Sequence, residues 1–77
     1  MTVAFVVINT EPGKENDVYS ALQHVPEVAE LHPLSGEFDL IAKLETSSFD
    51  SLGELIVSRV RSIPGVLNTK TFTGTRW

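Results

Sequence analysis

Two short groups of polar residues in the 77-residue chain have types and spacing that suit the binding of a small polar molecule. In the run Gly36-Glu37-Phe38-Asp39, the glycine lets the backbone approach a ligand closely, and Asp39 offers a carboxylate to an ammonium group. The second group is a row of threonines spaced by two, which puts three hydroxyls on one face of a strand: Thr69, Thr71 and Thr73. An amino acid, with its ammonium and carboxylate, is the kind of ligand that such groups bind.

Each group also has a purely structural interpretation. Gly36 follows Ser35 in a turn signal, and Asp39 is then a solvated residue that points outward at the start of a strand. Threonine is a good strand former, so the row is equally the polar side of a strand. The residues alone leave both interpretations open at both places.

The sequence lacks the residue groups that perform most enzyme chemistry. It has no Gly-rich phosphate loop, no H-x-x-x-H pair, no Ser or Cys nucleophile elbow and no cysteine at all. We therefore predict no enzyme activity, no cofactor and no metal site. One enzyme class stays open, the small dimeric α/β-barrel monooxygenases and isomerases, for which His32 and Asp39 are the only candidate catalytic residues.

The charge balance and the N-terminal sequence limit the partners. Ten acidic residues against six basic ones give a formal net charge of −4, and the basic residues are scattered, whereas a nucleic-acid-binding protein needs a basic patch. The apolar stretch 1–9 follows no basic residues, has no cleavage site and is too short to cross a bilayer. We expect a cytoplasmic protein that binds no membrane and makes no direct contact with nucleic acid.

The first half of the chain predicts a strand, a helix and a hairpin. Val3–Ile8 is an unbroken run rich in β-branched residues, typical of a buried strand. A helical stripe ends before Pro26 and consists of Val18, Ala21, Leu22 and Val25. The runs Val28–Leu34 and Phe38–Leu44 then predict a hairpin, in which Pro33 indicates an edge position or a bulge.

The second half repeats this plan. Ser47 is the predicted N-cap of a helix whose apolar stripe is Phe49, Leu52, Ile56, Val60 and Ile63. Pro64-Gly65 ends this helix, and Val66–Thr73 predicts the last strand, in which Leu67 shares the face of the threonine row. The order β-α-β-β-α-β, in two similar halves, predicts an α+β protein: one ferredoxin-like βαββαβ sandwich over residues 1–77.

This fold requires a partner chain. The helices cover one face of the sheet, yet both parities of Val3–Ile8 are apolar, so both faces of this strand require burial. A domain this short is marginally stable alone, and it has no disulfide to support it. We therefore predict an oligomer with a second sheet on the open face, and the large ring of Trp77 also favours burial against a neighbouring subunit.

Two motifs carry a resemblance to a known family. Gly36-Glu37-Phe38-Asp39-Leu40 resembles the G-x-[YF]-D-[LY] hairpin of the Lrp/AsnC effector domain, and Ile63-Pro64-Gly65-Val66 with Thr69 and Thr71 resembles its L-P-G-V-x-x-T-x-T segment. The likeness extends from Val3 to Thr73. Members usually begin with a helix-turn-helix DNA-binding domain, and we expect this protein to lack one.

The resemblance implies a stand-alone ligand-binding module of the kind called a RAM domain or SARD protein. It also implies a homodimer of the dimeric α/β-barrel type, assembled into an octamer or decamer that binds amino-acid effectors between dimers. On this basis Gly36, Glu37, Phe38, Asp39, Thr69, Thr71 and Thr73 are the expected ligand-binding residues. A structural assembly unit, or a partner of full-length Lrp/AsnC regulators, is the remaining alternative.

Overall fold

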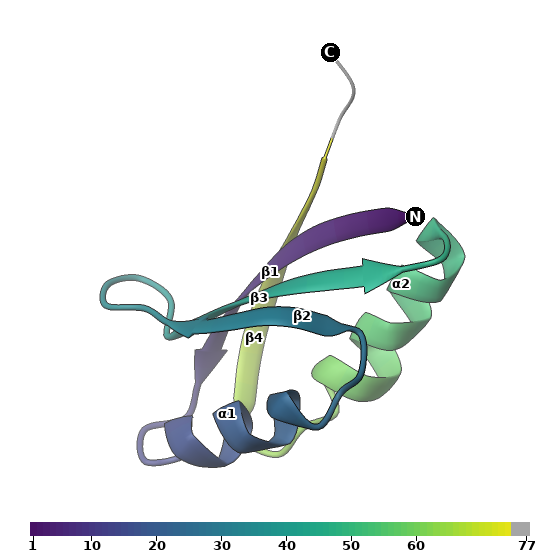
Figure 1. The fold of residues 1–77 in the computed structure, drawn as a ribbon. Helices are drawn as coiled ribbons and strands as arrows, with labels where there is room; N and C mark the ends of the chain where they lie inside the picture. Colours follow the sequence, from purple (N-terminus) through teal and green to yellow (C-terminus); the bar gives the residue numbers. More distant parts are fainter. Residues whose placement is uncertain (75–77) are drawn as a thin grey trace.

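The computed structural model describes residues 1–74, in which the elements follow the predicted order. They are β1 (Thr2–Thr10), α1 (Glu15–Gln23), β2 (Val28–Pro33), β3 (Leu40–Thr46), α2 (Phe49–Leu55) with a π-helical continuation η1 (Ile56–Val60), and β4 (Val66–Thr73). The strands form one antiparallel sheet in the order β2-β3-β1-β4, and both helices lie on the same side of it (Figure 1). The predicted ferredoxin-like α+β fold is confirmed. Trp77 lies outside the described residues.

The core lies between the sheet and the helices. Alternate residues of β1 and β3 point into it, because successive side chains of a strand face opposite ways. Its members are Ala4, Val6, Ile8, Val18, Leu22, Val25, Leu40, Ala42, Leu44, Leu52, Leu55 and Val60. The Gly65 turn at the start of β4 packs against this layer, with its backbone close to Lys14 and Val18 of the α1 region.

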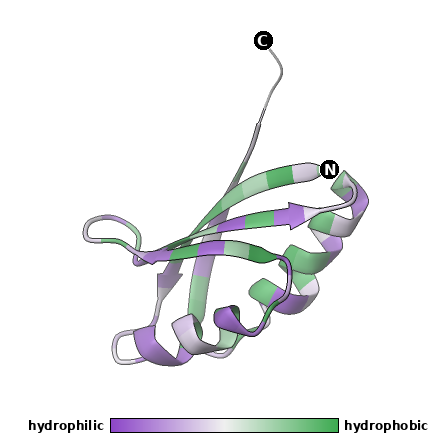
Figure 2. Ribbon diagram, viewed as in Figure 1, coloured by the Kyte–Doolittle hydropathy of each residue, from purple (hydrophilic) through white to green (hydrophobic). Residues whose placement is uncertain are grey.

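The opposite face of the sheet is open and has two chemically different halves. On β1 and β4, Phe5 and Phe72 are cross-strand partners, and they are 42% and 49% exposed. On β2 and β3, Lys43 forms ion pairs with Glu30 at 3.6 Å and Glu45 at 3.7 Å. Hydrophobic segments run along much of β1 in Figure 2. The expectation that both faces of β1 are apolar is therefore confirmed.

The hairpin differs from the prediction at one boundary. Pro33 lies on β2, which is an edge strand as expected, and the register shift falls earlier, between Val28 and Glu30. However, β3 begins at Leu40 and not at Phe38. Phe38 is not among the residues paired with β1 or β2, and the last main-chain bonds toward the loop are made by Asp39, whose N–H donates to the Ile8 carbonyl oxygen and whose carbonyl oxygen accepts from Leu34.

The helix boundaries also differ from the prediction. The N-cap of α2 is Ser48 and not Ser47, because Ser48 has extended backbone and its Oγ accepts from the Ser51 N–H at 3.1 Å. Helix α1 ends at Gln23, where His24 and Val25 make tighter i→i−3 bonds.

One predicted apolar contact is absent from the core. Phe49 is 64% exposed although its spacing placed it on the buried stripe of α2. Leu67, which shares the strand face of the threonine row, is 60% exposed on the outer strand β4. Within residues 1–74, no helix is both long and apolar enough to cross a membrane.

Candidate functional site

The loop between β2 and β3 is closed by main-chain hydrogen bonds. The Leu34 N–H donates to the Asp39 carbonyl oxygen at 2.8 Å, and the Asp39 N–H donates to the Ile8 carbonyl oxygen at 2.9 Å. Gly36 lies at the tip with φ 137°, a conformation that favours glycine. The loop therefore holds Asp39 in a fixed position beside the end of β1.

The Asp39 carboxylate is part of the internal hydrogen bonding of the protein. Its Oδ2 accepts from the Thr10 N–H at 2.8 Å and from the Thr10 Oγ1 hydroxyl at 3.2 Å. Thr10 is only 6% exposed, so these bonds satisfy donors that water hardly reaches. The structural interpretation of Asp39 as a solvated outward residue is therefore wrong in its detail, because the side chain is partly buried and ties the hairpin to β1.

A cleft of about 320 Å³ adjoins this carboxylate, between the hairpin and the start of α1. Its lining residues are Glu15, Asn16, Tyr19, Pro33, Leu34, Asp39 and Leu40. The lining combines two carboxylates, an amide and a phenol with three apolar side chains. Such a surface suits a small ligand that carries a cationic group and an apolar part, since clefts that bind small molecules are mostly apolar with a few placed polar groups.

Only one of the four predicted hairpin residues lines this cleft. Asp39 does so, whereas Gly36 and Glu37 are exposed at the tip and Phe38 is half-buried. The three α1 residues of the lining, Glu15, Asn16 and Tyr19, were not predicted from the sequence. None of them belongs to the stripe that predicted the helix, although Tyr19 is partly buried and packs against the core. They approach Asp39 through the tertiary packing of α1 beside the hairpin, for which no local pattern gives a signal.

The threonine row lies on one face of a strand, as predicted, but away from the cleft. Thr69, Thr71 and Thr73 are cross-strand partners of Ile8, Val6 and Ala4, so they lie on the side of the sheet that carries the helices. Thr69 is half-buried, and the other two are exposed on the outer strand β4. Within one chain, none of these three threonines lines the hairpin cleft.

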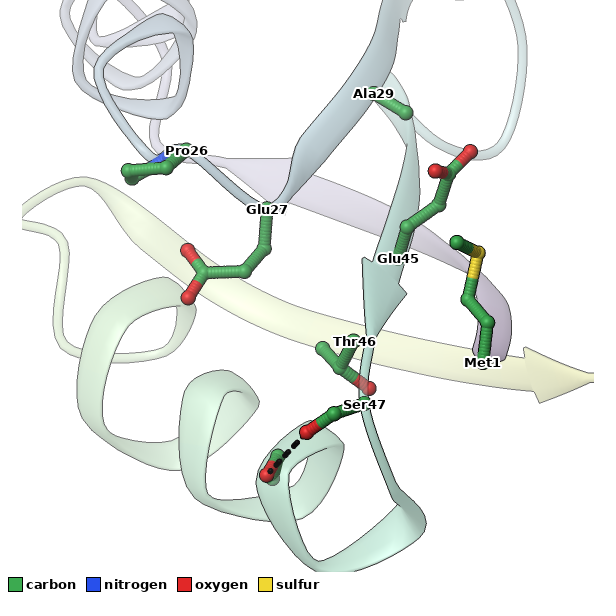
Figure 3. Close-up of a pocket in the computed structure, with 8 residues that line it drawn as sticks. Met1, Pro26, Glu27, Ala29, Glu45, Thr46 and Ser47 are labelled. Atoms are coloured by element: carbon green, nitrogen blue, oxygen red, sulfur yellow. Dashed lines mark hydrogen bonds between the residues drawn. The ribbon is translucent and has the colours of Figure 1, made fainter.

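A larger hollow, of about 690 Å³, lies at the opposite end of β2 and β3 (Figure 3). In Figure 3, the carboxylate of Glu27 points toward α2, while the side chain of Met1 extends toward the side of the strand that carries Glu45. Glu27 Oε1 is buried and has no hydrogen-bond partner within the described residues. Residues 1–74 contain no cluster of three or more side chains that could hold a metal ion.

The two candidate catalytic residues do not share a site. His32 lies on β2 opposite Ile41, with its Nε2 3.3 Å from Glu30 Oε1, and it does not line the cleft that contains Asp39. The hydrogen bond from His32, together with the charge of Lys43, lowers the pKa of Glu30 below its usual value of 4.5. This group is an exposed ion-pair network on the open sheet face.

Comparison with known proteins gives a consistent result. The family model of the Lrp/AsnC ligand binding domain matches residues 3–75. A solved structure, FFRP-DM1, superimposes with a TM-score of 0.94 at 36% identity, over 97% of this chain and 100% of that one. The feast or famine regulatory protein from M. tuberculosis, solved in complex with L-methionine, has a TM-score of 0.84 at 24% identity, over 100% of this chain and 52% of that one, which supports the fold alone.

Curated relatives are longer than this chain. The HTH-type transcriptional regulator PH1916 of Pyrococcus horikoshii, itself uncharacterized, is 32% identical over 73 residues, which are 91% of this chain and 49% of that protein. The chain thus spans about half the length of the curated relatives that it matches.

Proposed function

The chain belongs to the Lrp/AsnC ligand-binding domain family, and from this premise we propose that it is an effector-binding and assembly module that takes a free amino acid in the hairpin cleft. The relatives are named as HTH-type transcriptional regulators, which supports a role in regulation and not in catalysis. We expect the output to pass through DNA-binding regulators of the same family in the cytoplasm, since the domain has a net charge of −4 and only scattered basic residues.

The observation that carries the proposal is the position of Asp39 in the cleft. Its Oδ2 is occupied by the two bonds from Thr10, and within the described residues no hydrogen bond to Oδ1 is present. An ammonium group that binds Oδ1, with Glu15 as a second carboxylate on the cleft wall, leaves the Thr10 bonds intact. Leu34 and Leu40 then provide apolar contact for the effector side chain.

A neighbouring chain would complete the site. The cleft has carboxylates for an ammonium but no lysine or arginine among its lining residues to pair with the effector carboxylate. The hydroxyls of the threonine row, exposed at Thr71 and Thr73, are suitable donors if another subunit brings them to the hairpin. The proposed binding residues therefore remain the 36–39 hairpin of one subunit and the threonine row of another.

The open sheet face is the proposed dimer interface. The pair Phe5 and Phe72 forms the exposed apolar half of this face, and burying such aromatic surface against a second sheet is favourable. The ion pairs of Lys43 provide a polar region beside it, as is usual in interfaces with an apolar centre. Dimers then gather into an octamer or decamer.

A thermal-shift screen of the twenty amino acids tests effector binding. A ligand at 100 times its Kd stabilises the folded state by about 2.7 kcal/mol, which corresponds to a rise in Tm of roughly 10–20 °C for a domain of this size. The M. tuberculosis protein named above was solved with L-methionine, so methionine is the first amino acid to test. No shift with any amino acid at millimolar concentration contradicts the proposal.

The variant that locates the effector is Asp39→Asn. The amide oxygen still accepts from Thr10, but the charge that binds the ammonium is gone, so the variant should fold and lose the shift. Asp17→Asn makes the same change at an exposed position of α1 that does not line the cleft, and it is the matched control, which should keep the shift. A full shift in Asp39→Asn would place the effector elsewhere, and the hollow around Glu27 would be examined next.

A further inference from the structure

The hairpin cleft carries two acidic side chains that no cationic side chain in its lining offsets. Glu15 lines it from α1, and Asp39 lines it from the hairpin. Neither carboxylate takes part in the ion pairs found within residues 1–74. No lysine, arginine or histidine of the described part of the chain is among the lining residues. A cleft lined by charges of one sign concentrates ions of the opposite sign, so this one attracts cations.

The cation that is nearest in sequence does not supply the missing charge. Lys14 precedes Glu15, but its side chain begins against the turn at Gly65, where an added Cβ would lie 2.8 Å from Lys14 Cβ and 3.4 Å from its Cγ. Lys14 is not among the residues that line the cleft. The positive charge that the cleft attracts therefore comes from outside this chain, as part of a bound molecule.

The two carboxylates belong to different walls of the cleft, and apolar surface accompanies each of them. On the hairpin wall, the Leu34 N–H donates to the Asp39 carbonyl oxygen, so the two side chains start from adjacent backbone, and Leu34 is 42% exposed. On the helix wall, Glu15 and Tyr19 are four residues apart and share one side of α1. A ligand that reaches both carboxylates therefore also contacts apolar side chains of the lining.

Glu15 also has a structural role, which Asp17 shares. Both lie in the first turn of α1, where a negative charge interacts favourably with the helix dipole. Asp17 is exposed and does not line the cleft, so the helix has an acidic residue for this purpose that a ligand does not reach. Comparison of the two positions therefore separates the effect on the helix from the effect on the cleft.

We propose that the effector of this cleft is a basic amino acid, whose α-ammonium group binds Asp39 and whose side-chain cation binds Glu15. This inference rests on the proposed function, since it names the class of amino acid that the same cleft selects. The methylene groups of such a side chain contact Leu34, which is exposed in the free cleft. A neutral amino acid leaves Glu15 without a partner, and an acidic one adds a further negative charge to the cleft. The affinity therefore decreases from basic to neutral to acidic amino acids.

Isothermal titration calorimetry of the full chain with lysine, norleucine and Nε-acetyl-lysine tests this selection. Norleucine lacks the terminal ammonium group of lysine, and the acetylated form keeps the side chain but not its charge. Because Glu15 is exposed, lysine should bind roughly two- to fivefold more tightly than either. This advantage should shrink as salt is added, since ions screen exposed charges. A chain that binds norleucine as tightly as lysine overturns the inference and leaves the proposed amino-acid binding intact.

The variant Glu15→Gln assigns the preference to one side chain. Its affinity for lysine should fall to that for norleucine, while its affinity for norleucine stays nearly unchanged. Asp17→Asn removes a charge from the same turn of α1 outside the cleft and should keep the preference for lysine. Glu15→Asp keeps the charge and should retain part of the preference, which a purely structural role of Glu15 does not predict. An unchanged preference in Glu15→Gln, or an equal loss in Asp17→Asn, overturns the inference.

Two further titrations separate this inference from the proposed function. Cadaverine is lysine without its carboxylate, and it should bind more weakly than lysine. If cadaverine binds as tightly and Glu15→Gln weakens it, the amino-acid part of the proposed function fails, whereas the pairing of two cations with Glu15 and Asp39 stands. Calcium chloride alone should give no binding, because residues 1–74 contain no group of three or more side chains that could hold a metal ion. Calcium binding that Glu15→Gln abolishes, without any binding of lysine, overturns the inference.

Discussion

Replacing Asp39 with alanine should destabilise the folded chain even when no ligand is present. The substitution removes the acceptor of two hydrogen bonds, from the Thr10 N–H at 2.8 Å and the Thr10 hydroxyl at 3.2 Å. The hydroxyl can rotate toward another acceptor, but the N–H is fixed by the backbone of β1. Because Thr10 is 6% exposed, the N–H has little access to water.

The expected loss follows from that unsatisfied donor. A buried polar group left without a partner costs about 1–3 kcal/mol, and we take about 2 kcal/mol as the central value. One kcal/mol shifts the Tm of a domain of 60–100 residues by about 4–8 °C, so Asp39→Ala should melt roughly 8–16 °C below the wild type. Asp39→Asn keeps an acceptor oxygen, so its Tm should fall by only a few degrees.

Thermal unfolding at one fixed protein concentration measures these shifts, since Tm depends on concentration in an oligomer. Thr10→Val is the matched control, because it removes the hydroxyl bond and keeps the backbone one. The Tm should be highest for the wild type, lower for Asp39→Asn and Thr10→Val, and lowest for Asp39→Ala. If Asp39→Ala melts with the wild type, Asp39 does not hold the hairpin to β1, and the reasoning about a pre-positioned carboxylate is wrong.

Two further predictions concern the turn at Gly65 and the ion pairs of the open face. Gly65→Ala should be less stable than Gly13→Ala by about 1–3 kcal/mol in denaturant unfolding. Both glycines have positive φ (100° and 87°), but only at Gly65 would an added Cβ lie 2.8 Å from Lys14 Cβ. Equal losses of stability in the two variants would refute this steric argument. The Glu30 carboxyl should titrate below 4.5 by NMR and move back toward that value in His32→Ala, since the His32 hydrogen bond is the largest cause of its lowered pKa. A carboxyl whose pKa is lowered by folding stabilises the folded state at pH values above its unfolded pKa. This stabilisation is lost as the pH falls through the pKa of the folded state, so the loss is expected below pH 4.5.

The sequence predicts those parts of the fold that depend on periodicity. The apolar residues on both faces of β1 indicated a covered face and an open apolar one, and Phe5 now lies exposed on the open side. Pro33 indicated an edge strand because it lacks an N–H, and β2 is at the edge. The predicted alternation of apolar and polar residues along β3 was correct, because the side chains on its core side are buried and those on its other side are only half-buried.

The failures occur where the choice depends on contacts outside a local pattern. Ser47 and Ser48 are chemically identical N-cap candidates, and only the backbone conformation at Ser48 decides between them. Phe49 satisfies the helical spacing but lies at the margin of the stripe, where the position of the sheet decides burial. The cleft residues Glu15 and Tyr19 come from an element distant in sequence, so only the folded chain reveals that they approach Asp39.

The relation between effector binding and assembly depends on what completes the cleft. Asp39 is already held by Thr10, so an effector that binds its free oxygen finds a prepared carboxylate and needs no rearrangement of β1. An effector changes assembly only through a difference in its affinity for the assembled and dissociated states. A cleft that is complete within one chain gives no such difference, so diluting the protein until it dissociates then leaves its affinity for the effector unchanged. The cleft lining offers no cation for the effector carboxylate, which favours completion by a neighbouring subunit. In that case, assembly must strengthen effector binding by the same factor by which the effector strengthens assembly.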